Sequence, residues 1–175
     1  MTLTGRGGTA EERRAALSRY ALLPLRLFLG ITFVYAGVDK LTDSAFLAAQ
    51  GQGSLGELMR SVRDTAAIPG LVDLGLKSPV SFGYALALGE LAVGLGTLFG
   101  AFARVAAAGG ALISLTLWLT VSWPTTPYYY GNDLAYLMAW LPLILAGAPL
   151  LSVDAMWARG GRGRARRGRR GRLFS

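Results

Sequence analysis

Two charged residues lie inside long apolar stretches and are the first candidates for chemistry. Arg26 lies near the start of the apolar run 21–41, and Glu90 lies near the middle of the run 81–100. A charge at the centre of a membrane helix costs about 2.5–3.5 kcal/mol on insertion scales, so neither residue should face lipid unpaired. If the two runs are antiparallel, counting from their inner ends places Arg26 and Glu90 within roughly two helical turns. We therefore predict a direct or water-bridged contact between them.

Two interpretations of this pair remain open at the sequence level. Arg26 and Glu90 can form a structural ion pair that joins two helices. Alternatively, they line a polar cavity as catalytic residues, with Glu90 accepting or relaying a proton.

A second group of polar residues lies at the opposite, outer ends of the apolar runs. Asp39 and Lys40 close the first run, Tyr35 precedes Asp39 by one turn, and Asp133 opens the last run. Lys and Tyr are common anchors at a membrane interface, and Asp133 with its neighbour Asn132 can cap a helix. The alternative is that Tyr35, Asp39, Lys40 and Asp133 converge with residues 128–130 on one outer pocket that binds a substrate.

The composition excludes several kinds of redox site. The 175 residues include no Cys and no His, which rules out disulfides, thiolate nucleophiles and His-ligated haem in this chain. With ten acidic residues, most of them outside the apolar runs, we expect no bound metal. Redox chemistry would need an organic cofactor or a partner subunit.

Four apolar segments must position these residues. A bilayer core is crossed by about 20 apolar residues, and unpaired backbone groups are not tolerated there, so each segment should be a helix. The sequence predicts an all-α membrane protein, a four-transmembrane-helix bundle with spans near 21–41, 81–100, 105–123 and 134–151.

Basic residues orient the predicted bundle. Arg104 lies in the short link between spans two and three, while the link between spans three and four contains no Lys or Arg. Lys and Arg are enriched in cytoplasmic loops. We therefore expect a multi-pass protein of the plasma (inner) membrane with both termini cytoplasmic.

The long connection between spans one and two contains an amphipathic helix. Ser54 and Glu57 form a capping-box pattern, and Leu55, Leu58, Met59 and Val62 follow at helical spacing. Pro69-Gly70 should end this pattern. We expect the helix to lie on the outer face, either merely covering the bundle mouth or acting as a lid over a site.

The C-terminal tail carries the net charge of +8, because eight arginines and no acidic residue fall within residues 159–175. We predict three regions: a cytoplasmic lead (1–19), the membrane domain (20–155) and a disordered tail (156–175). Anionic lipid headgroups are the expected ligand of the tail, with nucleic acid or an acidic soluble partner as alternatives. The lipid-binding candidates are Arg162, Arg164, Arg166, Arg167, Arg169 and Arg170.

Three segments resemble the DoxX/DoxD family of small membrane proteins over about residues 20–155. They are LPLRLFLGITFVYAGVDKL, GELAVGLGTLFGAFARVAAAGGA and DLAYLMAWLPLILAGAPLLSVDA. The first includes Arg26, Gly30, Gly37 and Lys40. The second carries Glu90, Gly94, Gly100 and Arg104.

This resemblance implies a role in sulfur or oxidative-stress redox metabolism. The best-defined activity in the family is that of a thiosulfate:quinone oxidoreductase, in which a DoxD-type subunit works with a small DoxA-type subunit. A membrane-diffusible quinone is then the expected cofactor, and Arg26, Tyr35 or Lys40 would donate to its carbonyl oxygens. Thiosulfate would be attracted to Lys40 or Arg104.

Two other functional classes stay open. The chain can be a non-catalytic scaffold that recruits soluble redox enzymes, or a carrier of protons or small solutes. Unbroken spans without an evident half-repeat make the carrier the weakest hypothesis. A homo-oligomer is compatible with each of the three.

Overall fold

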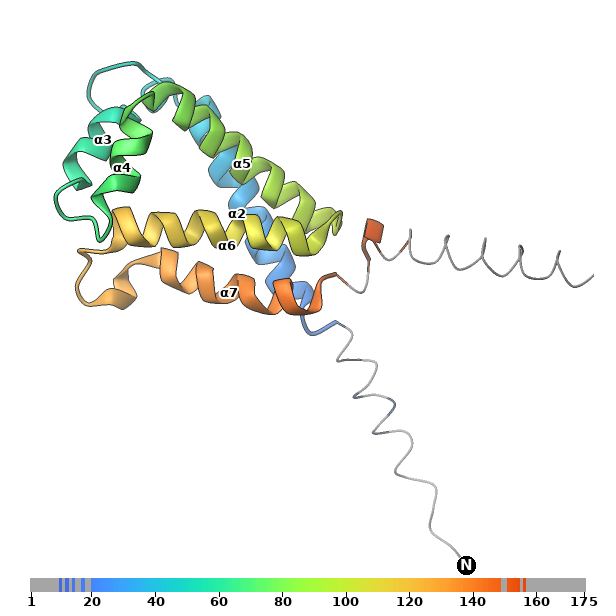
Figure 1. Ribbon diagram of the computed structural model, residues 1–175. Helices are drawn as coiled ribbons and strands as arrows, with labels where there is room; N and C mark the ends of the chain where they lie inside the picture. Colours follow the sequence, from blue (N-terminus) through green and yellow to red (C-terminus); the bar gives the residue numbers. More distant parts are fainter. Residues whose placement is uncertain are drawn as a thin grey trace, which may run out of the picture.

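The computed structural model describes residues 10, 12, 14, 17, 20–148, 151–154 and 156, and this part of the chain is helical with no strand. Four longer helices form its body (Figure 1). They are α2 (Leu23–Thr42), α5 (Pro79–Phe99), α6 (Ala103–Leu117) and α7 (Asn132–Ala146). The all-helical prediction is confirmed for the described residues.

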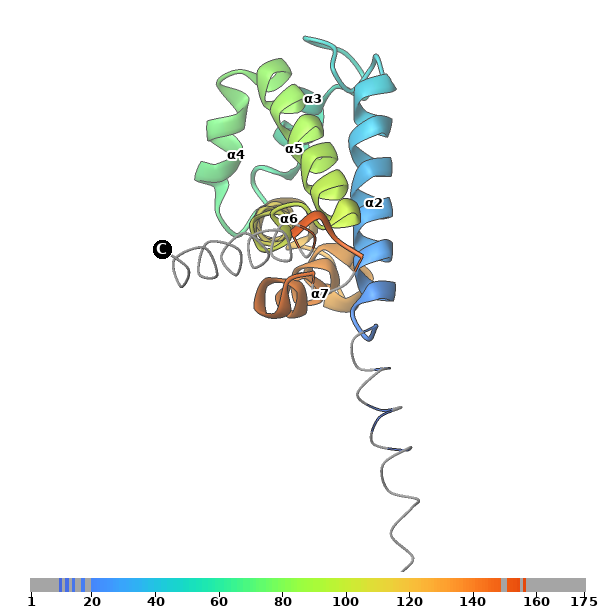
Figure 2. The same ribbon diagram turned by 90° about the vertical axis from the view of Figure 1, so that its right-hand side faces the viewer.

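The four helices form two antiparallel pairs, α2 with α5 and α6 with α7. Figure 2 shows α2 and α5 along their length, whereas α6 and α7 are seen nearly end-on, so the pairs cross. At the crossing a hydrophobic core forms around Leu29, Phe33, Ala107 and Trp140. Away from it, α5 and α6 diverge toward the end of the molecule that holds the remaining helices (Figure 1).

Those remaining helices form a short hairpin, α3 (Leu55–Val62) and α4 (Pro69–Leu76). The predicted cap of α3 is present, since the Ser54 hydroxyl accepts a hydrogen bond from Glu57 N at 3.3 Å. The prediction that Pro69-Gly70 ends the helical pattern is incomplete. Pro69 starts α4, because a proline at the first helical position loses no intrahelical hydrogen bond.

The third predicted span has an irregular end. After Leu117, residues Trp118–Ser122 (η1) form a π-helical turn, and Tyr128–Tyr130 (η2) form a short 3₁₀ helix. The last span is shorter than predicted, because α7 ends at Ala146 and Gly147 adopts a positive φ of 70°.

Within the described residues, two helices are long and apolar enough by themselves to cross a membrane. They are Pro79–Phe99 and Ala103–Ser122, the latter combining α6 and η1. The apolar helix α7 is shorter, and α2 contains the charged residues Arg26, Asp39 and Lys40. Membrane character is thus supported.

Candidate functional site: the buried Lys40–Glu90 pair

Glycine packing between α2 and α5 determines which polar residues meet. A Cβ atom added to Gly37 would lie 2.7 Å from the Ala87 carbonyl oxygen and 2.8 Å from Leu91 N, so only hydrogen fits there. This contact brings Glu90, on α5, level with Gly37 on α2. Lys40 follows Gly37 by about one helical turn and is therefore within reach of Glu90.

Lys40 and Glu90 form an ion pair inside the molecule. The Lys40 ammonium lies 3.1 Å from Glu90 Oε1 and 2.8 Å from Oε2. Glu90 is 3% exposed, whereas the Lys40 side chain is 23% exposed. The lysine thus neutralises a carboxylate that is almost fully removed from solvent while its own side chain stays partly exposed.

A second carboxylate lies near this pair. The Ser122 hydroxyl, at the end of η1, donates a hydrogen bond to Asp133 on α7. Asp133 is close enough to interact electrostatically with both Lys40 and Glu90. Glu90 contacts the ammonium directly, and Asp133, bound by Ser122, adds a second carboxylate to the electrostatic surroundings of the pair.

The predicted contact between Arg26 and Glu90 is wrong. Glu90 pairs with Lys40, and Arg26, which is 6% exposed, donates to the Leu151 carbonyl oxygen at 2.7 Å. Glu90 lies level with Gly37, which is eleven residues from Arg26, or about 16 Å along a helix. The helices are antiparallel as expected, but the register separates the two charges by about three turns.

Arg104 also lies at the end where Arg26 is found. Its guanidinium donates to the Leu145 carbonyl oxygen at 3.2 Å, across the α6–α7 pair. Arg26 and Arg104 therefore each bond the chain at or just after the end of α7 and are not brought to the Lys40–Glu90 pair.

The residues of the predicted outer pocket differ in their surroundings. Asp133 interacts electrostatically with Lys40, whereas Tyr35 is 71% exposed on the surface of α2 and Asp39 is also exposed. Tyr128–Tyr130 are exposed and their rings contact one another.

Three interior donors were missed by sequence reasoning, namely Trp140 Nε1, Ser114 Oγ and Thr97 Oγ1. The Trp140 indole is fully buried over Gly110, and Ser114 follows Gly110 by one turn at 1% exposure. Neither Trp140 Nε1 nor Ser114 Oγ has a hydrogen-bond partner among the described residues. The only sequence signal was a tryptophan, a serine and a threonine inside apolar runs, which is common in membrane helices.

Asp154 has a structural role that the sequence did not reveal. Its carboxylate accepts hydrogen bonds from Phe102 N and Ala103 N, each at 2.9 Å, at the start of α6. Asp154 is thus the cap of a helix more than fifty residues earlier in the chain. The described residues contain no group of three His, Cys, Asp or Glu side chains able to hold a metal ion.

Comparison with known proteins gave one match. A family model described as DoxX matches residues 21–123, more than half of the chain. This region includes Lys40 and Glu90 but ends before Asp133. No curated protein and no solved structure gave a match to the chain.

Proposed function

The chain belongs to the DoxX family, and from this premise we propose that it is the membrane subunit of a quinone-linked redox system. The observation that carries the proposal is the Lys40–Glu90 ion pair, with Asp133 nearby, inside apolar helices. Buried ionisable residues are costly among membrane helices and typically mark proton or substrate paths.

The residues present suit a quinone headgroup. A quinone, when bound, would supply the capacity to take up two electrons and two protons. Its carbonyl oxygens need hydrogen-bond donors, and Lys40 is a donor beside the buried carboxylate.

In this proposal each polar residue has a distinct task. Lys40 would donate a hydrogen bond to the quinone oxygen and compensate negative charge there, and Glu90 would be the group that holds and supplies a proton. Asp133, held by Ser122, is the second proton-exchanging group. Because the chain has no Cys or His, the electrons come from a partner, either a small DoxA-like subunit or a soluble redox enzyme, with thiosulfate as the candidate donor.

We further propose that α2, α5, α6 and α7 all cross the plasma membrane, with both termini cytoplasmic. Large apolar side chains are exposed on each of these helices, which suits contact with lipid rather than water. Examples are Ile31, Leu88, Leu112 and Leu145. The exposed Trp123 and Tyr128–Tyr130 would then belong to the outer interface.

Cysteine labelling tests this topology. Because the natural chain has no Cys, Gly131→Cys and Ser175→Cys each introduce one unique label site. A membrane-impermeant maleimide should label the first variant, and not the second, on intact cells. The reverse pattern would refute the proposed orientation.

The experiment that tests the redox proposal measures quinone binding and reduction separately. Lys40→Met should weaken binding of decylubiquinone to the reconstituted full-length protein at least tenfold, because a donor is lost. Glu90→Gln should retain binding and slow thiosulfate-dependent reduction of decylubiquinone in membranes that contain the partner proteins. Arg63→Gln removes an exposed charge on the α3–α4 hairpin and serves as the control.

The double variant Lys40→Met with Glu90→Gln separates function from folding. Each single change leaves a buried group uncompensated, so the double variant should recover much of the lost stability. If the double variant folds well and binds decylubiquinone as the natural protein does, Lys40 and Glu90 have only a structural role. Absence of decylubiquinone binding by the natural protein would also contradict the proposal.

The second candidate function is a membrane scaffold for soluble redox or oxidative-stress enzymes. The observation that favours it is the tract of eight arginines without an acidic residue in residues 159–175. Its charge is uniformly positive, which suits docking of an acidic soluble partner. A scaffold requires the tail for enzyme recruitment but tolerates the double variant Lys40→Met with Glu90→Gln, whereas the oxidoreductase subunit does not.

A further inference from the structure

An apolar cavity of about 310 Å³ lies between the α3–α4 hairpin and the diverging helices α5 and α6. In Figure 1 the hairpin occupies the wide end of the space between α5 and α6. This cavity does not include Lys40, Glu90 or Asp133. Its lining includes Met59, Val72, Phe82, Leu86, Leu112 and Leu117.

The lining offers nothing to a polar ligand. Among the described residues, no charged side chain borders the cavity, and its only hydroxyls belong to Thr116 and Thr120. Thr116 donates to the Leu112 carbonyl at 2.9 Å, and Thr120 donates to the Thr116 carbonyl at 2.7 Å. Both hydroxyls are thus satisfied by their own helix. A water molecule in such a space would lack the two to four polar partners it needs.

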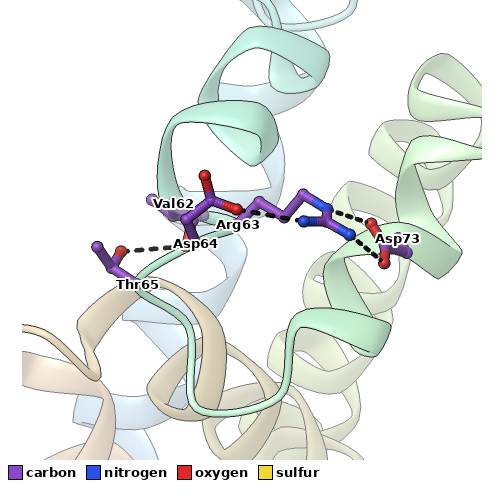
Figure 3. Close-up of polar contacts among 5 residues, drawn as sticks. All are labelled: Val62, Arg63, Asp64, Thr65 and Asp73. Carbon is purple, nitrogen blue, oxygen red and sulfur yellow. Dashed lines mark hydrogen bonds and ion pairs between the residues drawn. The ribbon is translucent and has the colours of Figure 1, made fainter.

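The hairpin that covers the cavity is anchored at several points, so the space is preformed. Leu55 N donates to the Phe46 carbonyl at 3.0 Å, and Ala67 N donates to the Leu119 carbonyl of the π-helical turn at 2.9 Å. Figure 3 shows a third connection, in which the Arg63 guanidinium bridges to both carboxylate oxygens of Asp73. The first two contacts fix the hairpin to the rest of the molecule and the third joins α3 to α4, while the buried cluster of Leu55, Met59 and Val72 packs against Phe82 of α5.

The cavity also reaches the outer surface of the helices. Leu112 and Val121 line it and yet are 64% and 48% exposed, and Ala85 is a further exposed lining residue. These residues belong to Pro79–Phe99 and Ala103–Ser122, the two helices that are long and apolar enough to cross a membrane. The opening therefore lies on a surface that faces hydrocarbon once the protein is in a bilayer.

We propose that this cavity binds a single hydrocarbon chain that enters from the bilayer, either an acyl chain or an isoprenoid chain. The volume of about 310 Å³ is twice that of an apolar cavity of about 150 Å³ that accommodates benzene, so it holds a chain segment rather than a small gas molecule. The lining provides dispersion contacts on several sides, which an empty space of this size would forfeit. The proposal does not depend on the redox function.

Photocrosslinking tests the proposal with the full-length protein in phosphatidylcholine/phosphatidylglycerol vesicles. The probes are palmitic acid and geranylgeraniol, each carrying a diazirine on its chain, and labelled peptides are identified by mass spectrometry. We expect labelling of lining residues such as Met59, Val72 or Leu117. Labelling by one probe alone identifies the chain type, and labelling by both shows that either chain enters.

Two variants and one matched control localise the label. Thr116→Phe fills the cavity and Ala85→Trp blocks its opening, and each should reduce labelling of the lining at least fivefold. Ala85 is exposed, so its variant keeps the test valid if Thr116→Phe fails to fold. Ala92→Trp places the same side chain at an exposed position of α5 outside the cavity and should leave labelling unchanged.

Two results would overturn the proposal. One is absence of labelled lining residues with both probes, and the other is equal labelling in Ala85→Trp and Ala92→Trp. Enlarging the cavity with Leu117→Ala gives an independent check, because more space should increase labelling by the chain that fits. A decrease in a folded Leu117→Ala variant would also contradict a chain-binding cavity.

Discussion

At the scale of single residues, the interior of this protein contains a charge that must be compensated. Glu90 is almost fully buried, and its compensation comes from one lysine whose position is determined by the close contact at Gly37. A buried carboxylate without a partner is strongly destabilising. Glu90 on α5 therefore requires a basic residue at position 40 of α2. At the other end of the molecule, Asp154 performs a similar task for backbone N–H groups of α6.

Asp154→Asn should destabilise the fold by about 1–2 kcal/mol, because a carboxylate that accepts two backbone N–H bonds at a helix start is replaced by a neutral amide. The amide has one acceptor oxygen, and its NH₂ group would face the second N–H. Unfolding in a mixed-detergent titration measures the loss. Asp39→Asn is the control, since Asp39 is exposed and makes no side-chain hydrogen bond among the described residues. Equal stability of both variants would contradict the capping role.

At the scale of elements, glycines govern how α2 and α5 meet. A Cβ atom at Gly94 would lie 2.6 Å from Val34 N and 2.9 Å from the Gly30 carbonyl oxygen, so the two backbones are in direct contact. Gly30, Gly37, Gly94 and Gly100 were the glycines that carried the resemblance to the DoxX family. The structure explains why these positions hold glycine. Gly30, Gly37 and Gly94 form the close α2–α5 contact, and Gly100 turns the chain with φ +62° against Ser152.

Gly94→Ala should therefore destabilise the protein by about 1–3 kcal/mol, because the added methyl group forces α2 and α5 apart. Gly89→Ala is the matched control on the same helix, where the nearest neighbour of an added Cβ is Ile113 Cδ1 at 3.8 Å. Thermal unfolding followed by circular dichroism in detergent compares the two. A Gly89→Ala variant as unstable as Gly94→Ala would refute this register of α2 against α5.

The α3–α4 hairpin should respond to acid through Arg63 and Asp73. The hydrogen bond from Arg63 and its charge hold the pKa of Asp73 below its usual value. The pair therefore stabilises the closed hairpin at pH values above the ordinary Asp pKa. This stabilisation is lost as the pH falls through the lower pKa that Asp73 has in the closed hairpin. The pair is exposed, so we expect a local opening rather than global unfolding.

Spin labels at Ser61 and Leu74 would report this opening as a change in their distance distribution between about pH 6 and about pH 3. Asp73→Asn should show the broadened distribution at both values. Asp64→Asn should keep the response, because Asp64 makes one contact of 3.2 Å to Arg63 and its side chain is 89% exposed. Identical distributions for the natural protein at both pH values would contradict the prediction.

At the scale of the whole molecule, the two crossing helix pairs separate the polar residues into two regions. Lys40, Glu90 and Asp133 belong to one, and Arg26, Arg104 and Asp154 belong to the other. The arginine-rich residues 159–175 lie outside the described part of the chain, so their role is still a sequence-based prediction.

Truncation after Ala158 should preserve the helical body and weaken binding of the detergent-solubilised protein to anionic vesicles. The tract has no acidic residue and little apolar content, and each basic residue near an anionic surface contributes about 1 kcal/mol. Vesicle flotation measures the binding, and circular dichroism measures the fold. Unfolding of the truncated protein would show that the tail is structural.

The sequence by itself determined the helical class, the approximate ranges of the apolar helices and the cap of α3. These features follow from local properties: apolar run length, helical spacing and the Ser54–Glu57 pattern. It also singled out Glu90 and Lys40, because a charged residue within or beside an apolar run can be recognised from the sequence alone.

Tertiary structure alone decided which charges meet. The sequence suggested Arg26 for Glu90, but the glycine contacts of α2 and α5 set a register that brings Lys40 to it instead. The second hairpin helix, the cap from Asp154 and the buried donors of Trp140 and Ser114 were likewise not evident beforehand. Each depends on packing between segments distant in the chain, and helical periodicity carries no information on how far one helix slides along another.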